Sequence, residues 1–197
     1  MSVFVSMFLF ALIGAITPGP VNIIATGAGV NFGFRRALPH VLGASLSYSG
    51  VVLLAGLGLN SLSLVMPLLT PILQYLAAAY LLYMALRIGA APVSQTAQLS
   101  LAMPPKLLEG VLVQGLNPKA WLVAMSGVSL FVSSQQPAFY YLLVFCLVSF
   151  IVCLFGVGAW AALGTLISSF LATPRRMRGF NLLMASLLVL SVCSWFW

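Results

Sequence analysis

Three ionisable side chains stand out in this 197-residue chain because so few others could take part in chemistry. Lys119 lies 12 residues past Leu107, where a predicted membrane segment begins. That spacing places it about 18 Å along a helix, inside a bilayer core of about 30 Å. A charge at such depth usually faces a cavity and a partner. We predict that Lys119 binds the carboxylate of a substrate; the alternative is a lysine that snorkels to a membrane surface.

The other two ionisable candidates are Glu109 and His40, either of which could carry a proton. Glu109 is the only acidic residue of the chain, and a role in proton coupling would require it to be buried without a cation. Its spacing from Lys106 favours a surface ion pair on one helix face instead. His40 follows Pro39 and is more typical of an interface residue, although it is the only other group that titrates near neutrality. The sequence leaves open which of the two titrates during a working cycle.

A proline motif, Thr17-Pro18-Gly19-Pro20, interrupts the first apolar segment. Both prolines lack a backbone N–H and clash with the preceding turn, and the glycine between them adopts any backbone angles. The helix should break here, and open backbone at membrane depth persists only where it is buried in protein or lines a wet cavity. All four residues are therefore candidates for a substrate site. Thr17 could cap the following half-helix, and Asn22 could cap it or contact the ligand.

A second break is predicted at Asn117-Pro118-Lys119, where Pro118 lies 100 residues after Pro18 and Asn117 matches Thr17. Interrupted segments at matching positions in two halves point to a transporter site; the alternative is two unrelated proline kinks. The free N–H groups of a half-helix bind anions. The opposing helix end or Asn117 could bind an ammonium group. The predicted site therefore suits a zwitterion.

The composition of the chain indicates the class of protein that contains these motifs. The chain is 62% hydrophobic and 5% charged, with a mean hydropathy of +1.17, whereas soluble domains carry about 25% charged residues. We therefore predict an all-α integral membrane protein. The formal charge of +7 comes from short loops, so topology explains it better than nucleic-acid binding. One histidine, one acid and three scattered cysteines predict no metal site and no cofactor.

Six hydrophobic stretches are each close to the length needed to span a bilayer. We predict one transmembrane domain over 1–197, built as two inverted three-helix repeats, 1–90 and 107–197, joined by a linker at 91–106. Helices 1 and 4 carry the proline breaks. The six predicted spans are Val3–Val30, Leu38–Leu59, Pro71–Ala91, Leu107–Phe131, Ala138–Leu163 and Gly179–Trp197.

The loop charges predict the orientation. The connections Asn60–Thr70 and Val132–Pro137 carry no charge, and basic residues mark the cytoplasmic side. Both termini should then face the periplasm. No basic residue precedes the first apolar run and no small-residue cleavage site follows it, so we expect it to remain as a helix. The basic residues on the cytoplasmic side are Arg35, Arg36, Arg87, Lys106, Arg175, Arg176 and Arg178.

The order and spacing of four motifs resemble the LysE/RhtB family of bacterial amino-acid exporters over nearly the whole chain. The resemblance implies a six-helix secondary exporter of amino acids or close derivatives in the inner membrane, driven by the proton gradient. The motifs are Thr17-Pro18-Gly19-Pro20 with Asn22, Gly33-Phe34-Arg35-Arg36-Ala37 leading to Gly43, Ala79-Tyr80-Leu81-Leu82-Tyr83, and Leu116-Asn117-Pro118-Lys119-Ala120.

One departure from the family pattern concerns the substrate. Many members carry Gly, three residues, Gly and Asp in the second helix, where this chain has Gly43, Ser47 and Tyr48. The acid is missing, and Tyr48 joins the substrate-binding candidates. The departure disfavours cationic substrates and favours neutral ones of the cysteine, O-acetylserine, threonine, homoserine or leucine type.

The leading hypothesis is thus a secondary exporter of neutral amino acids that contacts its small-molecule substrate and membrane lipid, but no nucleic acid. A metal or inorganic-ion exporter on a related scaffold ranks lower because such a site needs several carboxylates, imidazoles or thiolates. An intramembrane enzyme ranks lower because no nucleophile and base stand together. The sequence leaves the oligomeric state open, a homodimer included.

Overall fold

The computed structural model describes residues 2–90 and 103–193, without the side chains of 59–70 and 73. Every regular element in these residues is a helix, as the composition predicts. Most of the predicted linker 91–106 and the last four residues of the sixth predicted span lie outside the described residues. The helices are α1 (Val3–Ile16), α2 (Pro20–Phe32), α3 (Phe34–Gly89), α4 (Leu107–Gly115), α5 (Pro118–Phe131), α6 (Ala138–Ile167) and α7 (Pro174–Cys193).

Both predicted helix breaks are present. The first separates α1 from α2, whose axes meet at 61°. The second separates α4 from α5, and together these two helices cover the predicted span Leu107–Phe131. Pro20 and Pro118 each occupy the start of the following helix, where the missing N–H of proline costs nothing. Each motif therefore ends one helix and begins the next in a new direction.

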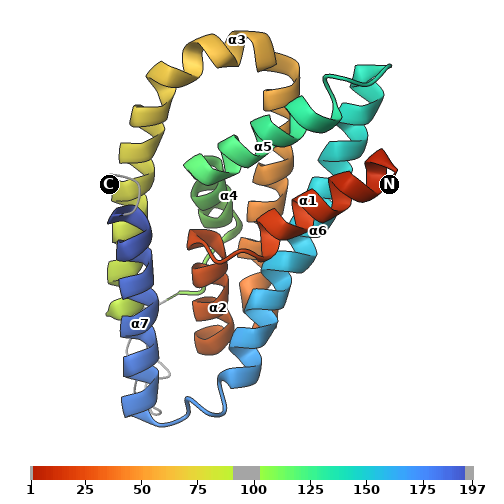
Figure 1. Ribbon diagram of the computed structural model, residues 1–197. Helices are drawn as coiled ribbons and strands as arrows, with labels where there is room; N and C mark the ends of the chain where they lie inside the picture. Colours follow the sequence, from red (N-terminus) through yellow and green to blue (C-terminus); the bar gives the residue numbers. More distant parts are fainter. Residues whose placement is uncertain (1, 91–102, 194–197) are drawn as a thin grey trace.

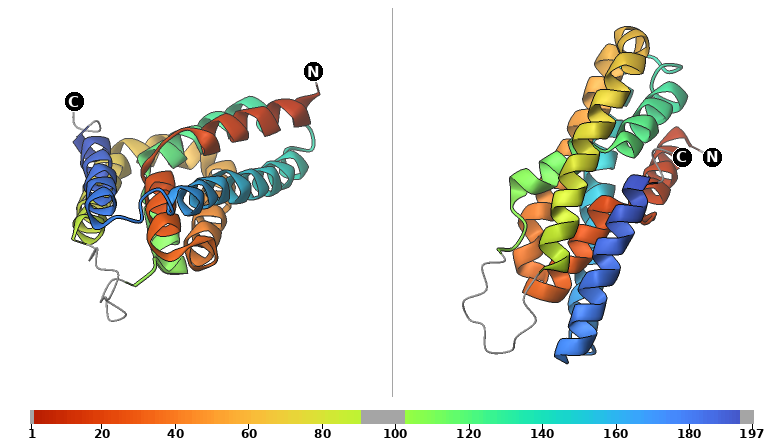
Figure 2. Two further views of the ribbon diagram at one scale, coloured as in Figure 1. Left: turned by 90° about the horizontal axis from the view of Figure 1, so that it is seen from below. Right: turned by 90° about the vertical axis from the view of Figure 1, so that its left-hand side faces the viewer.

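The prediction of a loop at Asn60–Thr70 is wrong at the level of the backbone. α3 runs without interruption from Phe34 to Gly89, curves over at the upper end of the molecule and returns (Figure 1). The sequence between 59 and 70 contains no glycine that would end a helix, and Pro67 within it does not interrupt α3. The chain therefore reverses direction through a curved helix, and its returning limb packs beside α7 (Figures 1 and 2).

The last helix also differs from its prediction, because α7 begins at Pro174 and not at Gly179. The three arginines between these positions indicate a loop by charge, but arginine is a good helix former and proline suits a first turn. The basic segments gather at the lower end of Figure 1, at the end of α2, the end of α3 and the start of α7.

Among the residues that the structure describes, three helical segments are long and apolar enough to cross a membrane, namely Phe34–Gly58 of α3, Ala138–Ile167 and Pro174–Cys193. The bent pair of α1 and α2 makes a fourth candidate if it counts as one span. Large apolar side chains also lie on the outside, with Phe155 exposed by 72% and Leu86 by 73%. A surface of this kind suits lipid far better than water. The chain is therefore a multi-pass membrane protein.

Two pairs of glycines bring helix backbones into direct contact. A Cβ atom added to Gly29 in α2 would collide with the carbonyl of Ala161 in α6, and one added to Gly164 in α6 would collide with the carbonyl of Thr26. The Thr165 hydroxyl donates a hydrogen bond of 3.1 Å to the Gly29 carbonyl across the same contact. Small residues permit such close crossings between membrane helices.

The second crossing joins α3 to α4. A Cβ atom at Gly43 would collide with the carbonyl of Leu107, and one at Gly110 would collide with the carbonyl of His40. We call the contact of Gly43 with Gly110, and that of Gly29 with Gly164, the inner crossings, because both lie in the half of the molecule that carries the basic segments. They join the first half of the chain to the second.

The inner crossings predict that an alanine substitution at Gly43 of α3 destabilises the protein and that the same substitution at Gly50 does not. Gly43→Ala should lower the free energy of unfolding by about 1–3 kcal/mol, because the added methyl group meets backbone that cannot move aside. Gly50→Ala is the matched control, since its Cβ atom would meet nothing within 4 Å. Thermal unfolding of the purified protein in detergent measures both. Equal melting temperatures for the two variants would contradict the close crossing.

Candidate functional site

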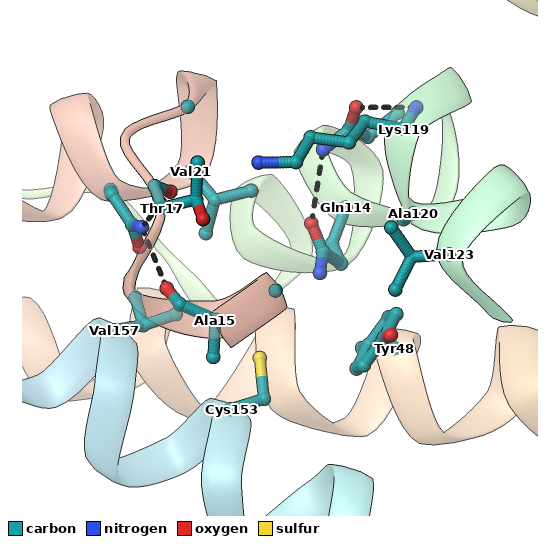
Figure 3. Close-up of a pocket in the computed structure, with 14 residues that line it drawn as sticks. Ala15, Thr17, Val21, Tyr48, Gln114, Lys119, Ala120, Val123, Cys153 and Val157 are labelled. Atoms are coloured by element: carbon teal, nitrogen blue, oxygen red, sulfur yellow. Dashed lines mark hydrogen bonds between the residues drawn. The ribbon is translucent and has the colours of Figure 1, made fainter. Parts of the chain in front are cut away.

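The two helix breaks line one cavity of about 470 Å³, including its open mouth. Thr17, Gly19 and Asn22 come from the first break, and Asn117 and Lys119 come from the second (Figure 3). The breaks therefore face each other across a hollow, as the matched motifs predict. Polar backbone that an unbroken helix would conceal reaches this space.

Of the remaining predicted site residues, Tyr48 lines the cavity and the three prolines do not. Tyr48 of α3 lines the cavity, and its side chain is 6% exposed. Pro18, Pro20 and Pro118 are not among the lining residues, so they act by shaping the backbone on which the others stand.

Sequence reasoning missed several lining residues, of which Gln114 and Cys153 carry polar atoms. Gln114 lies three residues before Asn117, one helical turn above the second break, and that spacing could have identified it. Cys153 and Val157 lie four residues apart on α6, a helix with neither a break nor a charge. No signal in the sequence distinguishes them from packing residues.

Asn22, which follows the break, caps the C-terminal end of α1. Its Nδ2 donates hydrogen bonds of 2.8 Å to the carbonyl of Ala15 and 3.0 Å to that of Thr17, and the side chain is 5% exposed. These carbonyls have no partner further along α1 because the helix ends there. Asn22 therefore caps the helix before the break and not its own half-helix.

The expectation that Thr17 caps α2 is also wrong. Its hydroxyl and its backbone N–H both donate to the carbonyl of Ile13, so Thr17 ends α1. Gly19 occupies the N-cap position of α2 in an extended conformation and makes no side-chain cap hydrogen bond. The next residue is Pro20, which has no N–H. The positive end of α2 thus reaches the cavity without a side-chain cap and favours an anion there.

The second break is satisfied internally. Asn117 Oδ1 accepts a 3.1 Å hydrogen bond from the Lys119 N–H at the start of α5, and Asn117 Nδ2 donates to Gln114 Oε1 at 3.4 Å. The Trp121 indole donates a 2.8 Å hydrogen bond to the Gly115 carbonyl at the end of α4. The backbone at this break is occupied, so the side chain of Lys119 is the group that remains for a ligand.

The Lys119 side chain is half-buried and extends from the start of α5 toward Thr17 and Val21 at the first break (Figure 3). No ion pair involves it among residues 2–90 and 103–193. The single acid of the chain, Glu109, is paired with Arg87. The cavity therefore combines an unpaired ammonium group with an uncapped helix start, and both favour a carboxylate.

The comparisons with known proteins agree with this geometry. Residues 12–193 match the family described as LysE type translocator. The chain belongs to the LysE type translocator family. The cysteine/O-acetylserine efflux proteins of Salmonella choleraesuis (strain SC-B67) and Salmonella typhimurium (strain LT2) are each 30% identical to it over 184 residues, which cover 93% of this chain and 92% of the relative. No solved structure matches the chain.

A third relative, the cysteine/O-acetylserine efflux protein of Escherichia coli (strain K12), is 29% identical over 185 residues, with 93% of this chain and 92% of the relative covered. Family and relatives together make the chain a translocator and not an enzyme, and they confirm the resemblance found in its motifs.

Glu109 lies at the start of α4 and does not line the cavity of this LysE type translocator. Its Oε1 pairs with the Arg87 guanidinium at the end of α3, and its Oε2 accepts a 3.0 Å hydrogen bond from the Lys106 N–H. The expected ion pair with Lys106 is therefore replaced by one with Arg87. The reason is that Glu109 occupies the third position of its helix, where it reaches back to its own N-cap.

His40 is fully buried in the translocator, at 0% exposure, and does not lie at an interface. Its Nε2 lies 3.3 Å from the carbonyl of Val21, a residue that lines the cavity.

The role of Asn22 predicts a loss of both stability and transport in the Asn22→Ala variant. The Ala15 and Thr17 carbonyls would lose a donor, at a cost of about 1–3 kcal/mol, and the first break would change shape. Asn31→Ala is the matched control, because Asn31 makes a similar 2.8 Å bond to the Gly27 carbonyl away from the break. It should lose stability but keep transport. The test is thermal unfolding together with substrate uptake into vesicles; equal transport by the two variants would contradict the role of Asn22.

Proposed function

We propose that this LysE type translocator exports neutral amino acids or close derivatives, of the cysteine, O-acetylserine, threonine, homoserine or leucine type, across the bacterial inner membrane. The supporting observation is a cavity between two helix breaks that holds one unpaired cation and an uncapped helix start, with no carboxylate among its lining residues. A zwitterion supplies the missing anion. The names of the relatives support a small polar amino acid in particular.

The substrate carboxylate binds between Lys119 and the start of α2. Both groups are positive, and Figure 3 shows the Lys119 side chain directed toward that side of the cavity. The substrate ammonium group turns to the neutral oxygens on the opposite wall, those of Tyr48 and Gln114. Hydrogen bonds to a charged group are stronger than those between neutral groups. The two ends of the zwitterion are therefore held by different helices.

The walls near the substrate side chain are small and uncharged. Val123, Val157 and Cys153 line the cavity, and the whole space is about 470 Å³ with its mouth. A second cation on the substrate would meet Lys119 with no acid to offset the repulsion. The site therefore selects neutral side chains over basic ones.

Transport across the bilayer follows from the proposed topology of six spans in two inverted repeats, 1–90 and 107–197, with both termini in the periplasm. The two proline breaks facing one cavity and the basic segments at one end of the molecule support it. Rocking of one repeat against the other then exposes the cavity to each side in turn. The proton gradient drives this cycle.

Lys119 provides the most direct test of the site. Lys119→Met keeps an unbranched side chain that is one atom shorter and removes the charge, so the apparent substrate affinity should fall by about ten- to a hundredfold. Lys106→Met is the matched control, because Lys106 lies at the start of α4 and does not line the cavity. Uptake of labelled O-acetylserine into inverted membrane vesicles measures both. Unchanged affinity in Lys119→Met would remove Lys119 from the site.

The charge of the cavity predicts a pattern of competition. Unlabelled cysteine, threonine or O-acetylserine should reduce uptake of the labelled substrate, whereas lysine and arginine should fail to compete, because their second positive charge is repelled by Lys119. The measurement is inhibition of vesicle uptake at matched concentrations. Strong competition by lysine would show that another group neutralises the cavity and would overturn the proposed selectivity.

A further inference from the structure

His40 is the only histidine of the chain, and it is fully buried in α3. Its Nε2 lies 3.3 Å from the carbonyl of Val21. A carbonyl oxygen only accepts hydrogen bonds, so Nε2 carries the hydrogen and Nδ1 is left as an acceptor. No donor reaches Nδ1 within the described residues. A buried polar atom without a partner is costly, and at a functional site such atoms frequently have a role.

The residue also joins the parts of the molecule that must move during transport. Its ring contacts Val21 at the start of α2, and Val21 lines the central cavity. Its backbone carbonyl lies against Gly110 of α4 at an inner crossing. His40 therefore lies between the cavity and the contact that has to open before the substrate can enter from the cytoplasm.

The ionisable groups around His40 come from three elements. Glu109 of α4 acts electrostatically on both His40 and Tyr80, and Arg87 of α3 pairs with Glu109. The Tyr80 hydroxyl, in the returning limb of α3, is a second buried polar group that has no partner among the described residues. From α6, Cys153 lies on the cavity side, while α2 has no ionisable residue. Glu109 is thus the one negative charge available to a charged imidazole.

Glu109 is itself a poor carrier for a moving proton. One of its oxygens is held by the Arg87 guanidinium and the other by the N–H of Lys106, so protonation would have to break an ion pair or a helix cap. Nδ1 of His40 has no such bond to lose. Within the described residues, the imidazole of His40 therefore has an open site for a proton, whereas the carboxylate of Glu109 does not.

We propose that His40 binds the proton that this translocator exchanges for its substrate. The proposal rests on the proposed function of amino-acid export. A proton from the periplasmic side adds to the Nδ1 lone pair and gives an imidazolium, while the Nε2–H remains on the Val21 carbonyl. When the inner crossings open, Nδ1 releases that proton to cytoplasmic water and the neutral ring is restored. No other bond is made or broken.

The position of His40 links proton binding to substrate binding. A charged imidazole at Val21 adds a second cation beside a cavity that already holds Lys119. This cation lies at the end of the proposed site that receives the substrate carboxylate, so the charge on His40 changes the affinity for the zwitterion, and the bound zwitterion changes the proton affinity of His40. An exchange of protons for substrate requires that the two binding events be linked.

His40→Gln separates coupling from binding, because the glutamine amide can still donate to Val21 but cannot take up a proton. In liposomes, uphill transport of O-acetylserine driven by a pH gradient should fall by at least about tenfold, while substrate exchange at equal pH stays within about twofold. Ser149→Ala is the matched control, since Ser149 is another fully buried polar side chain that no partner contacts in the part of the chain that the structure describes. It should keep both activities.

Full gradient-driven transport by His40→Gln would overturn the coupling role and leave the proposed function intact. Loss of exchange together with gradient-driven transport would assign His40 a structural role and would also overturn it. If the unaltered protein moves no amino acid in either assay, the proposed function itself fails.

The single histidine permits a direct measurement on the unaltered sequence. Protein with isotope-labelled histidine, purified through a tag that contains none, gives one imidazole signal in an NMR spectrum. We expect this signal to titrate between about pH 4 and 9 and its midpoint to move when O-acetylserine is added, because linked sites shift each other's equilibria. The proposal would be overturned by a signal that does not titrate, or by a titration midpoint that stays the same when the substrate is added. This measurement decides the question even if His40→Gln fails to fold.

Discussion

The start of α2 is the constraint on which the site depends. Its N-cap is a glycine and its first residue a proline, so the positive end of this helix is not closed by its own side chains. Such an end cannot face lipid and has to border a polar space. The packing around it follows: Asn22 satisfies the carbonyls on the other side of the break, and the second break is placed opposite. The backbone conformation at the start of α2 thereby determines where the protein needs a polar cavity.

The two breaks resemble each other in sequence but differ in what they leave available. At the second break, Asn117 and Trp121 satisfy the backbone on both sides, so its contribution to the cavity is a side chain, that of Lys119. At the first break, the contribution is the backbone itself. A zwitterion held between them touches one half of the chain through main-chain dipoles and the other through an ammonium group. This arrangement makes the bound substrate a bridge between the halves that are proposed to rock.

The sequence allows prediction of features that depend on local backbone chemistry and not of those that depend on packing. The proline breaks, the all-helical class and the place of Lys119 beside the second break follow from residue types and spacing, because proline and hydropathy act locally. The direction of capping at Thr17 and Asn22 does not, since it depends on how far the chain turns after the break. Cys153 reaches the cavity because α6 packs against the end of α1, where Gly156 lies against Ala15, a contact between residues far apart in the chain. The uncharged stretch at 59–70, which contains Pro67, resembles a loop by composition, but its backbone remains helical.

The use of charge in this chain connects binding to energy coupling. The sequence has one acidic residue, Glu109, and eight basic ones. The Glu109 carboxylate pairs with Arg87, next to the inner crossing at Gly110. Lys119 is therefore left without an internal counter-ion, and the neutral ring of His40 is left with an open nitrogen. An additional acid in the membrane would satisfy both groups, but the protein would then hold no vacancy for a ligand to fill. With one acid already engaged, the substrate carboxylate is the proposed counter-charge of Lys119 and an incoming proton is the proposed partner of His40. The scarcity of acids is thus the common physical basis of the proposed selectivity for a zwitterion and of the proposed response of the buried imidazole to the proton gradient.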